Sequence, residues 1–125
     1  MIGYVTLGTN KMDEAAAFYD ALLGVLGANR MMEAETFIAW AVNPGTPAIS
    51  IIKPADGDAA TAGNGTMVAL VVDSSETVDA LHAKALELGG TDEGAPGNRG
   101  DNFYAGYFRD LDGNKLNAFH MSHGE

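Results

Sequence analysis

The stretch Phe103–Phe119, FYAGYFRDLDGNKLNAF, decides the fold of this chain of 125 residues. Two apolar segments, Phe103–Phe108 and Asn114–Phe119, flank a polar turn that contains Asp112-Gly113. Asp-Gly between two apolar segments is a strong signal for a β-hairpin, because the turn requires positive φ and Gly adopts it without a Cβ clash. The stretch therefore predicts two antiparallel strands joined by a tight turn.

The second of these strands has two different sides. Leu116 and Ala118 alternate with Lys115 and Asn117, and successive side chains of a strand point to opposite faces of a sheet. One side is therefore apolar and suited to a core, whereas the other carries a charge and an amide.

The sequence upstream of the hairpin predicts two copies of one unit, made of a strand, a helix and three strands. In the first copy the expected elements are 2–8, a helix from Asn10 to about Leu26, 28–32, 36–42 and 48–52. In the second copy they are 66–72, a helix ending before Gly89-Gly90, a short strand at 91–93, a loop at 94–102 and the closing hairpin. The Gly-, Ala- and Asp-rich segment 53–65 separates the copies. The repeated order predicts a duplicated α+β fold.

Each expected helix has an apolar stripe and a polar residue at its start. Asn10 is suited to cap the first helix and the segment 73–75, Asp-Ser-Ser, to cap the second. Gly27 is placed to end the first helix. The residues that recur at helical spacing are Ala15, Phe18, Leu22 and Val25 in the first helix, and Val78, Leu81, Ala85 and Leu88 in the second.

The composition limits the classes of function. A net charge of −10 disfavours nucleic acid, whose binding depends on Lys and Arg, and anionic membrane surfaces; it favours neutral or cationic small ligands. The chain has no Cys, so disulfides and thiolate metal sites are excluded. No apolar run approaches the roughly 20 residues that span a bilayer. We therefore expect a single globular domain that resides in the cytoplasm.

These patterns resemble the vicinal-oxygen-chelate superfamily, which includes lactoylglutathione lyases, bleomycin-resistance proteins and extradiol dioxygenases. The resemblance covers essentially the whole chain. It rests on residues 1–28, MIGYVTLGTNKMDEAAAFYDALLGVLGA, with the Phe18-Tyr19 pair and the Leu-Gly helix end, and on residues 107–119, YFRDLDGNKLNAF. The second stretch is similar to the family's ending of a strand, Asp-Pro-Asp-Gly and a strand, with Leu111 where the family usually has Pro.

The resemblance implies a single domain, residues 1–125, with one module at 1–60 and a second at 61–125. The sheets of the two modules are expected to curve into an open, cup-shaped mixed sheet with the helices on its outer face, and two chains are expected to pair as a homodimer. Period-two reasoning adds the facing of the first strand of each module. It places Val5, Leu7, Val68, Leu70 and Val72 toward the helices, and Tyr4, Thr6, Met67, Ala69 and Val71 toward the cup.

Metal-dependent members of the family hold their ion with His and Glu on the first and last strand of each module. The matching positions in this chain are Tyr4, Ser50, Met67 and Asn117. A phenol, a hydroxyl, a thioether and an amide are poor ligands for a divalent ion that prefers imidazole and carboxylate. The sequence therefore predicts no metal cofactor, and it disfavours dioxygenase chemistry and metal-assisted isomerisation.

The three His residues offer no clear alternative metal site. His82 lies beside a helix stripe, and His120 and His123 are expected in a frayed tail.

The cup is expected to bind a ligand through aromatic and polar side chains. The candidate residues are Tyr4, Trp40, Ser50, Met67, Tyr104, Tyr107 and Asn117, with Arg99 from the loop at 94–102 as a handle for an anion and that loop as a lid. Which side of each middle strand lines the cup is left open by the sequence. An apolar cleft with a few polar groups is typical of a small-molecule pocket.

Two functions follow as the main hypotheses, beside a third interpretation in which the chain is a pseudoenzyme kept for pairing with another protein. The first is metal-independent binding of a small molecule, including sequestration of a cationic aromatic compound. The second is an enzyme, a lyase or isomerase of the lactoylglutathione-lyase type, which would require ligands at other positions or a metal-free mechanism using Tyr4 and Asn117. A fold can host many chemistries, so the choice depends on the site.

Overall fold

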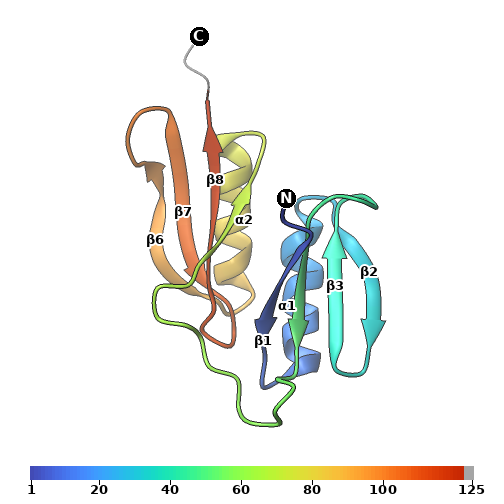
Figure 1. The fold of residues 1–125 in the computed structure, drawn as a ribbon. Helices are drawn as coiled ribbons and strands as arrows, with labels where there is room; N and C mark the ends of the chain where they lie inside the picture. Colours follow the sequence, from blue (N-terminus) through green and yellow to red (C-terminus); the bar gives the residue numbers. More distant parts are fainter. Residues whose placement is uncertain (123–125) are drawn as a thin grey trace.

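The computed structural model describes residues 1–122, and within them the chain forms two four-stranded sheets with one helix each (Figure 1). The first sheet has the order β1 (Tyr4–Gly8), β4 (Ala48–Ile52), β3 (Phe37–Ala41) and β2 (Asn29–Ala34). The second has the order β5 (Val68–Val71), β8 (Lys115–Met121), β7 (Phe103–Arg109) and β6 (Thr91–Asn98). Helices α1 (Met12–Gly24) and α2 (Ser75–Glu87) follow β1 and β5. The predicted α+β fold with two βαβββ modules is confirmed.

The two sheets share one pattern of pairing. In each sheet the first and last strands of the module run parallel, and the remaining pairs are antiparallel. A parallel pair requires a crossover, which the helix of each module provides. Ser50 lies opposite Thr6 in the first sheet, and Asn117 lies opposite Ala69 in the second. Ser50 and Asn117 therefore hold equivalent positions in the two modules.

The helices bury the predicted stripes except at their last positions, where Leu88 is half-buried and Val25 is exposed. Val78, Leu81 and Ala85 of α2 are fully buried, and Ser74 caps this helix by accepting a hydrogen bond of 3.1 Å from the Thr77 amide. In α1 the stripe is buried up to Leu22. Val25 is exposed, because α1 ends at Gly24 and the chain then turns.

The start of α1 differs from the prediction. Lys11, not Asn10, is the N-cap residue, and it makes no side-chain capping bond. The Asn10 side chain instead bonds the backbone of Ala60, with Nδ2 donating to the carbonyl at 3.0 Å and Oδ1 accepting from the amide at 2.7 Å. Asn10 therefore fastens the segment between the modules to the first module.

The predicted loop at 94–102 is shorter than expected, because its first part is a strand. Strand β6 continues to Asn98 along the outer edge of the second sheet, with register shifts on both sides of Gly94. Pro96 is tolerated there because an edge strand needs ladder hydrogen bonds on one side only. Most of the segment expected as a lid is therefore a strand. Likewise His120 lies in β8 instead of a frayed tail, and His123 lies outside the described residues.

The modules contact each other through their helices and through the turn at 110–114. α1 packs against α2, Asn114 Nδ2 donates to the Gly8 carbonyl at 3.0 Å, and Asp112 Oδ1 accepts from the Asn10 amide at 2.9 Å. Both helices lie on the same side of the two sheets (Figure 1). The opposite faces of the sheets are therefore turned to a common side. Neither helix has the length and apolar character needed to cross a membrane.

Candidate binding face

We call the side of each sheet that faces away from its helix the open face. In the second sheet, Leu116 and Ala118 of β8 are fully buried in the core. Their neighbours in sequence must point the other way. The open face of this sheet is therefore formed by Lys115, Asn117 and Phe119 of β8, Phe103, Ala105, Tyr107 and Arg109 of β7, and Ala69 and Val71 of β5.

The open face of the first sheet is mainly apolar. The Tyr4 side chain is 63% exposed, and its ring meets Phe37 edge to face with 6.3 Å between centroids. Met31 and Met32 complete a hollow of about 300 Å³ with them. Ser50 is buried, and its hydroxyl is already engaged with the Thr6 hydroxyl and the Val5 carbonyl, each at 2.9 Å.

The open face of the second sheet carries an aromatic surface. The rings of Phe103 and Phe119 stack with 5.4 Å between centroids and 26° between planes. Tyr107 lies on the same strand as Phe103 and is the cross-strand partner of Asn117. Asn117 is 2% exposed, and its Oδ1 has no hydrogen-bond partner among residues 1–122. A buried acceptor without a partner is unfavourable by about 1–3 kcal/mol, so a donor from outside this chain would stabilise it.

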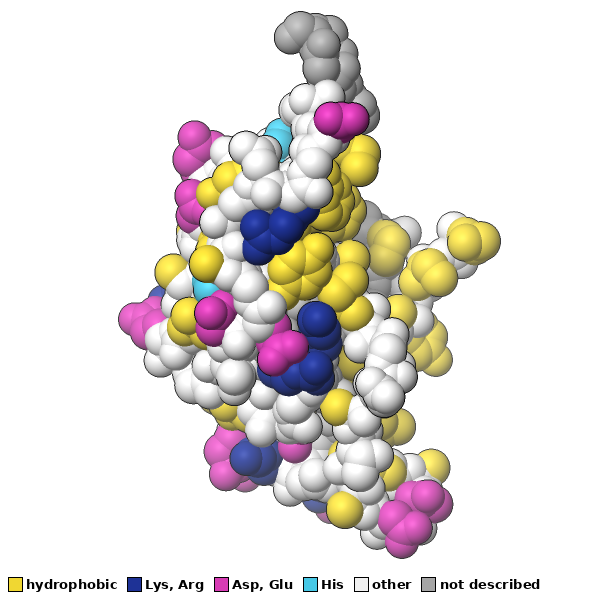
Figure 2. Space-filling view, turned by 90° about the vertical axis from the view of Figure 1, so that its left-hand side faces the viewer, with side chains coloured by type: hydrophobic (Ala, Val, Ile, Leu, Met, Phe, Trp, Pro, Cys, Tyr) yellow, Lys and Arg dark blue, Asp and Glu magenta, His cyan; other side chains and the backbone are white. Residues whose placement is uncertain are grey.

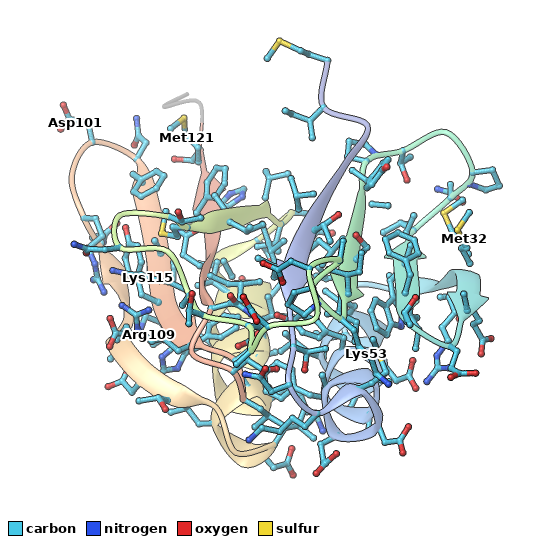
Figure 3. The ribbon with its side chains drawn as sticks, turned by 60° about the horizontal axis from the view of Figure 1, so that its bottom comes forward. Met32, Lys53, Asp101, Arg109, Lys115 and Met121 are labelled. Carbon is cyan, nitrogen blue, oxygen red and sulfur yellow. The ribbon has the colours of Figure 1, made fainter. Side chains whose placement is uncertain are left out.

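Positive charge surrounds Tyr107. The guanidinium carbon of Arg99 and the ammonium of Lys115 each lie 5.5 Å from its ring centroid. Glu93 pairs with Arg109 at 3.3 Å and with Lys115 at 3.9 Å. In Figure 2 apolar side chains lie between two groups of Lys and Arg side chains. Figure 3 shows Arg109 and Lys115 together on the second sheet, where they border a hollow of about 600 Å³ with residues 62–67.

The structure distributes the predicted site residues over both sheets. Tyr4 and Ser50 lie on the open face of the first sheet, and Tyr107 and Asn117 on that of the second. Met67 is exposed immediately before β5 and borders the same hollow as Lys115. Arg99 follows β6 and contacts Tyr107. Of the predicted set, Arg99, Tyr107 and Asn117 thus form a continuous group.

The prediction that Trp40 and Tyr104 line the cup is wrong, because both side chains face the helices. Trp40 is 1% exposed; its indole Nε1 donates to Asp20 of α1 at 2.8 Å, and its ring packs on Tyr19. The Tyr104 hydroxyl donates to Asp79 of α2 at 2.6 Å, and this bond raises the pKa of the phenol. Neither side chain reaches an open face.

The donor set does not fit the metal that the family's enzymes hold. The positions that match their ligands carry a phenol, a hydroxyl, a thioether and an amide, and the Ser50 hydroxyl is already bonded to its own sheet. Divalent ions of this kind need imidazole and carboxylate ligands. Among residues 1–122, no three His, Asp or Glu side chains gather in a possible metal site. We therefore derive no chemical step through a metal at these positions.

Sequence reasoning did not select three residues of this face, Arg109, Lys115 and Phe119, and it left the facing of Phe103 open. The signal for two of them was present, because the alternation that places Asn117 on one side of β8 places Lys115 and Phe119 there too. The ion pairs of Arg109 and Lys115 with Glu93 join three strands, so no local pattern could show them.

Known proteins support this architecture. The model of the family described as Glyoxalase/Bleomycin resistance protein/Dioxygenase superfamily matches residues 1–118. A glyoxalase/bleomycin resistance protein from Albidiferax ferrireducens is 37% identical, with a TM-score of 0.90 over 98% of this chain and 99% of the other. A family enzyme from Burkholderia phytofirmans is 21% identical, with a TM-score of 0.78 over 96% and 98% of the chains. Lactoylglutathione lyase from Agrobacterium tumefaciens is 19% identical, with a TM-score of 0.69 over 96% and 92%.

The last two similarities show the fold alone. Among curated proteins, none matches this chain.

Proposed function

The chain belongs to the Glyoxalase/Bleomycin resistance protein/Dioxygenase superfamily, and from this premise we propose that it binds an aromatic small molecule on the open face of its second sheet without a metal ion. One observation carries the proposal: a stacked aromatic pair, Phe103 and Phe119, lies on the same open face as Asn117, whose buried Oδ1 lacks a partner within the described chain. An apolar surface with a few oriented polar groups is the usual composition of a small-molecule site.

Binding is favoured over catalysis by the groups on this face. A glyoxalase-type isomerisation requires a Lewis acid and a carboxylate base. The positions that match the family's metal ligands lack imidazole and carboxylate, and the nearby carboxylate of Glu93 is engaged with Arg109 and Lys115. We therefore propose sequestration or carriage of the ligand. The absence of Cys supports the proposal that this occurs in the cytoplasm.

A homodimer would complete the site, and we include it in the proposal. β1 and β5 are edge strands of their sheets. Apolar side chains of and near these strands are exposed, with Ile2 54%, Tyr4 63% and Val71 71% accessible. A second copy that covers these side chains would bury apolar surface and enclose the open faces. Sedimentation velocity should give twice the chain mass of 13.0 kDa; a species of one chain mass at all concentrations would contradict the dimer.

Calorimetric titration with a panel of aromatic compounds tests the binding proposal. A compound that binds the native state also raises the free energy of unfolding by RT ln(1 + [L]/Kd), and the melting temperature rises with it. We expect Phe119→Ala to weaken binding, because it removes one ring of the stacked pair. Phe37→Ala is the matched control on the first sheet and should leave the affinity unchanged. No heat and no thermal shift with any compound would contradict the proposal.

Elemental analysis of the protein, purified without a metal-affinity step, tests the metal-free part. We expect no stoichiometric transition metal. One equivalent of Ni, Zn, Fe or Mn that is lost on substituting Asn117 would overturn this part and revive the lyase or isomerase hypothesis.

A further inference from the structure

Tyr107 contacts two cations on the open face of the second sheet, and these cations favour a ligand of negative charge. The guanidinium of Arg99 and the ammonium of Lys115 each lie 5.5 Å from the ring centroid. We propose that the second module selects an aromatic anion, such as an aromatic carboxylate, whose acidic group is held by Arg99 beside Tyr107, with Lys115 on the same ring adding to the positive potential. This inference rests on the proposed function and reverses the ligand charge that the net charge alone favours.

Arg99 is held in place by features of β6. Its Nη2 donates to the Ala95 carbonyl. A Cβ at Gly97 would lie 3.1 Å from Arg99 Nη1, and one at Gly94 would lie 3.4 Å from Nη2. Two glycines thus leave the space in which the guanidinium lies against the sheet. A cation seated in this way has lost part of its conformational freedom before binding, which reduces the entropic cost of holding an anion.

Arg99 has no acidic partner among residues 1–122, unlike the other cations of the group. No described carboxylate forms an ion pair with it, whereas Arg109 and Lys115 share Glu93. Three cations against one carboxylate leave a local formal charge of +2 in a chain whose net charge is −10. Asp101 follows Arg99 by two residues in the β6–β7 turn but forms no ion pair with it in the described part of the chain. The local potential therefore attracts anions even though the whole chain repels them.

A cationic aromatic ligand fits this face poorly. Cations are recognised by the π-face of an aromatic ring or by carboxylates. The Tyr107 ring is already engaged by Arg99 and Lys115, and Glu93 is paired with two cations. An anion instead gains charge-assisted hydrogen bonds, and its ring finds the stacked surface of Phe103 and Phe119 on the same face.

Calorimetric titration of the full chain with three compounds of one shape tests this inference. The compounds are 2-naphthoate, the uncharged 2-naphthamide and the cationic 2-naphthylmethylammonium. We expect 2-naphthoate to bind about tenfold more tightly than 2-naphthamide, because its carboxylate receives charge-assisted hydrogen bonds, and the cation to bind most weakly. Added NaCl should weaken the binding of 2-naphthoate and leave that of 2-naphthamide unchanged.

Two variants locate the effect. Arg99→Gln should abolish most of the preference for 2-naphthoate over 2-naphthamide while the amide still binds. Lys84→Gln removes one positive charge on α2, where Lys84 pairs with Glu87 at 2.8 Å, and should leave the preference unchanged. Equal affinities for the three compounds, or tighter binding of the cation, would overturn the anion assignment and leave the proposed function standing. No binding of any of the three would count against the proposed function itself.

Discussion

The Tyr19 hydroxyl donates a hydrogen bond of 2.6 Å to Oδ2 of Asp110, which joins the helix of the first module to the turn of the second. The same carboxylate accepts from the amides of Asp112 and Asn114 and from Asn114 Nδ2, at 2.9, 2.9 and 3.0 Å. Both Tyr19 and Asp110 are buried. Burial and the adjacent carboxylate raise the pKa of Tyr19 well above its ordinary value, so the phenol remains a donor. The Asp-Leu-Asp-Gly turn therefore shapes the hairpin and also connects the modules.

Removing the Tyr19 hydroxyl should destabilise the whole domain. In Tyr19→Phe the buried carboxylate of Asp110 loses one of its four donors, at a cost of about 1.5–3 kcal/mol for a hydrogen bond to a charged group. Urea unfolding measures this change. Tyr4→Phe is the matched control, because the Tyr4 side chain is largely exposed, and it should change stability by less than about 0.5 kcal/mol. Equal effects of the two substitutions would show that the bond between the modules does not contribute.

Two glycines should respond in opposite directions to substitution by Ala. A Cβ at Gly90 would lie 2.7 Å from the Arg109 carbonyl oxygen and 2.8 Å from that of Ala85, so Gly90→Ala forces the backbone apart and should cost about 1–3 kcal/mol. Gly24, in the last turn of α1, has nothing within 4 Å. Gly24→Ala should stabilise by about 0.5–1 kcal/mol, because Ala favours a helix. Thermal unfolding of both variants checks the signs; a stable Gly90→Ala variant would contradict the close packing.

Asp20 should make the free energy of unfolding depend on pH. Hydrogen bonds from Arg30, at 2.9 and 2.7 Å, and from the Trp40 indole hold the pKa of its carboxyl below the ordinary value. A lowered pKa in the folded state gives stability that is present above the unfolded pKa of about 3.9 and is lost as the pH falls through the folded pKa. Below about pH 4, wild-type stability should therefore fall more steeply than that of Asp20→Asn.

The fluorescence of Trp40, the only Trp of the chain, reports this unfolding directly. Urea titrations at a series of pH values give the two profiles. Parallel profiles for the wild type and Asp20→Asn would show that the Asp20 contacts do not contribute to folding.

Asn117 should oppose stability and favour binding. Its buried Oδ1 lacks a partner within the described chain, so Asn117→Leu removes an unsatisfied acceptor and should stabilise the free protein by about 1–3 kcal/mol. The same substitution should weaken the binding of ligands that donate a hydrogen bond. Thermal unfolding and calorimetry on one preparation measure both effects. A destabilised Asn117→Leu variant would mean that the amide already has a partner in the free protein.

The sequence predicts those parts of the fold in which a local pattern is unambiguous. Alternation of apolar and polar residues placed Tyr4 and Thr6 away from α1, and Asp-Gly located the β7–β8 turn. Alternation is absent from β3, because Phe37–Ala41 is apolar at almost every position. Nothing local could show that Trp40 faces Asp20.

The binding face is predictable only in part, since it depends on contacts between strands. Asn117 and Tyr107 are selected as candidate site residues from the sequence. That they are cross-strand neighbours follows only from the register of β7 and β8. Gly94 and Gly97 indicate a loop from sequence, but both lie in the edge strand β6. Their missing side chains leave room for the Arg99 guanidinium. The charge of a single face is likewise invisible in a net charge of −10.

The central claim is that the open face around Tyr107 binds an aromatic ligand, and a heteronuclear NMR titration of ¹⁵N-labelled protein with 2-naphthoate tests it most directly. The account predicts that the largest amide shifts fall on β7 and β8 around Tyr107 and Asn117, and that the loop hollow beside Thr9 and Lys53 is unaffected. Shifts confined to that hollow or to the first sheet, or no shifts at saturating ligand, would contradict it.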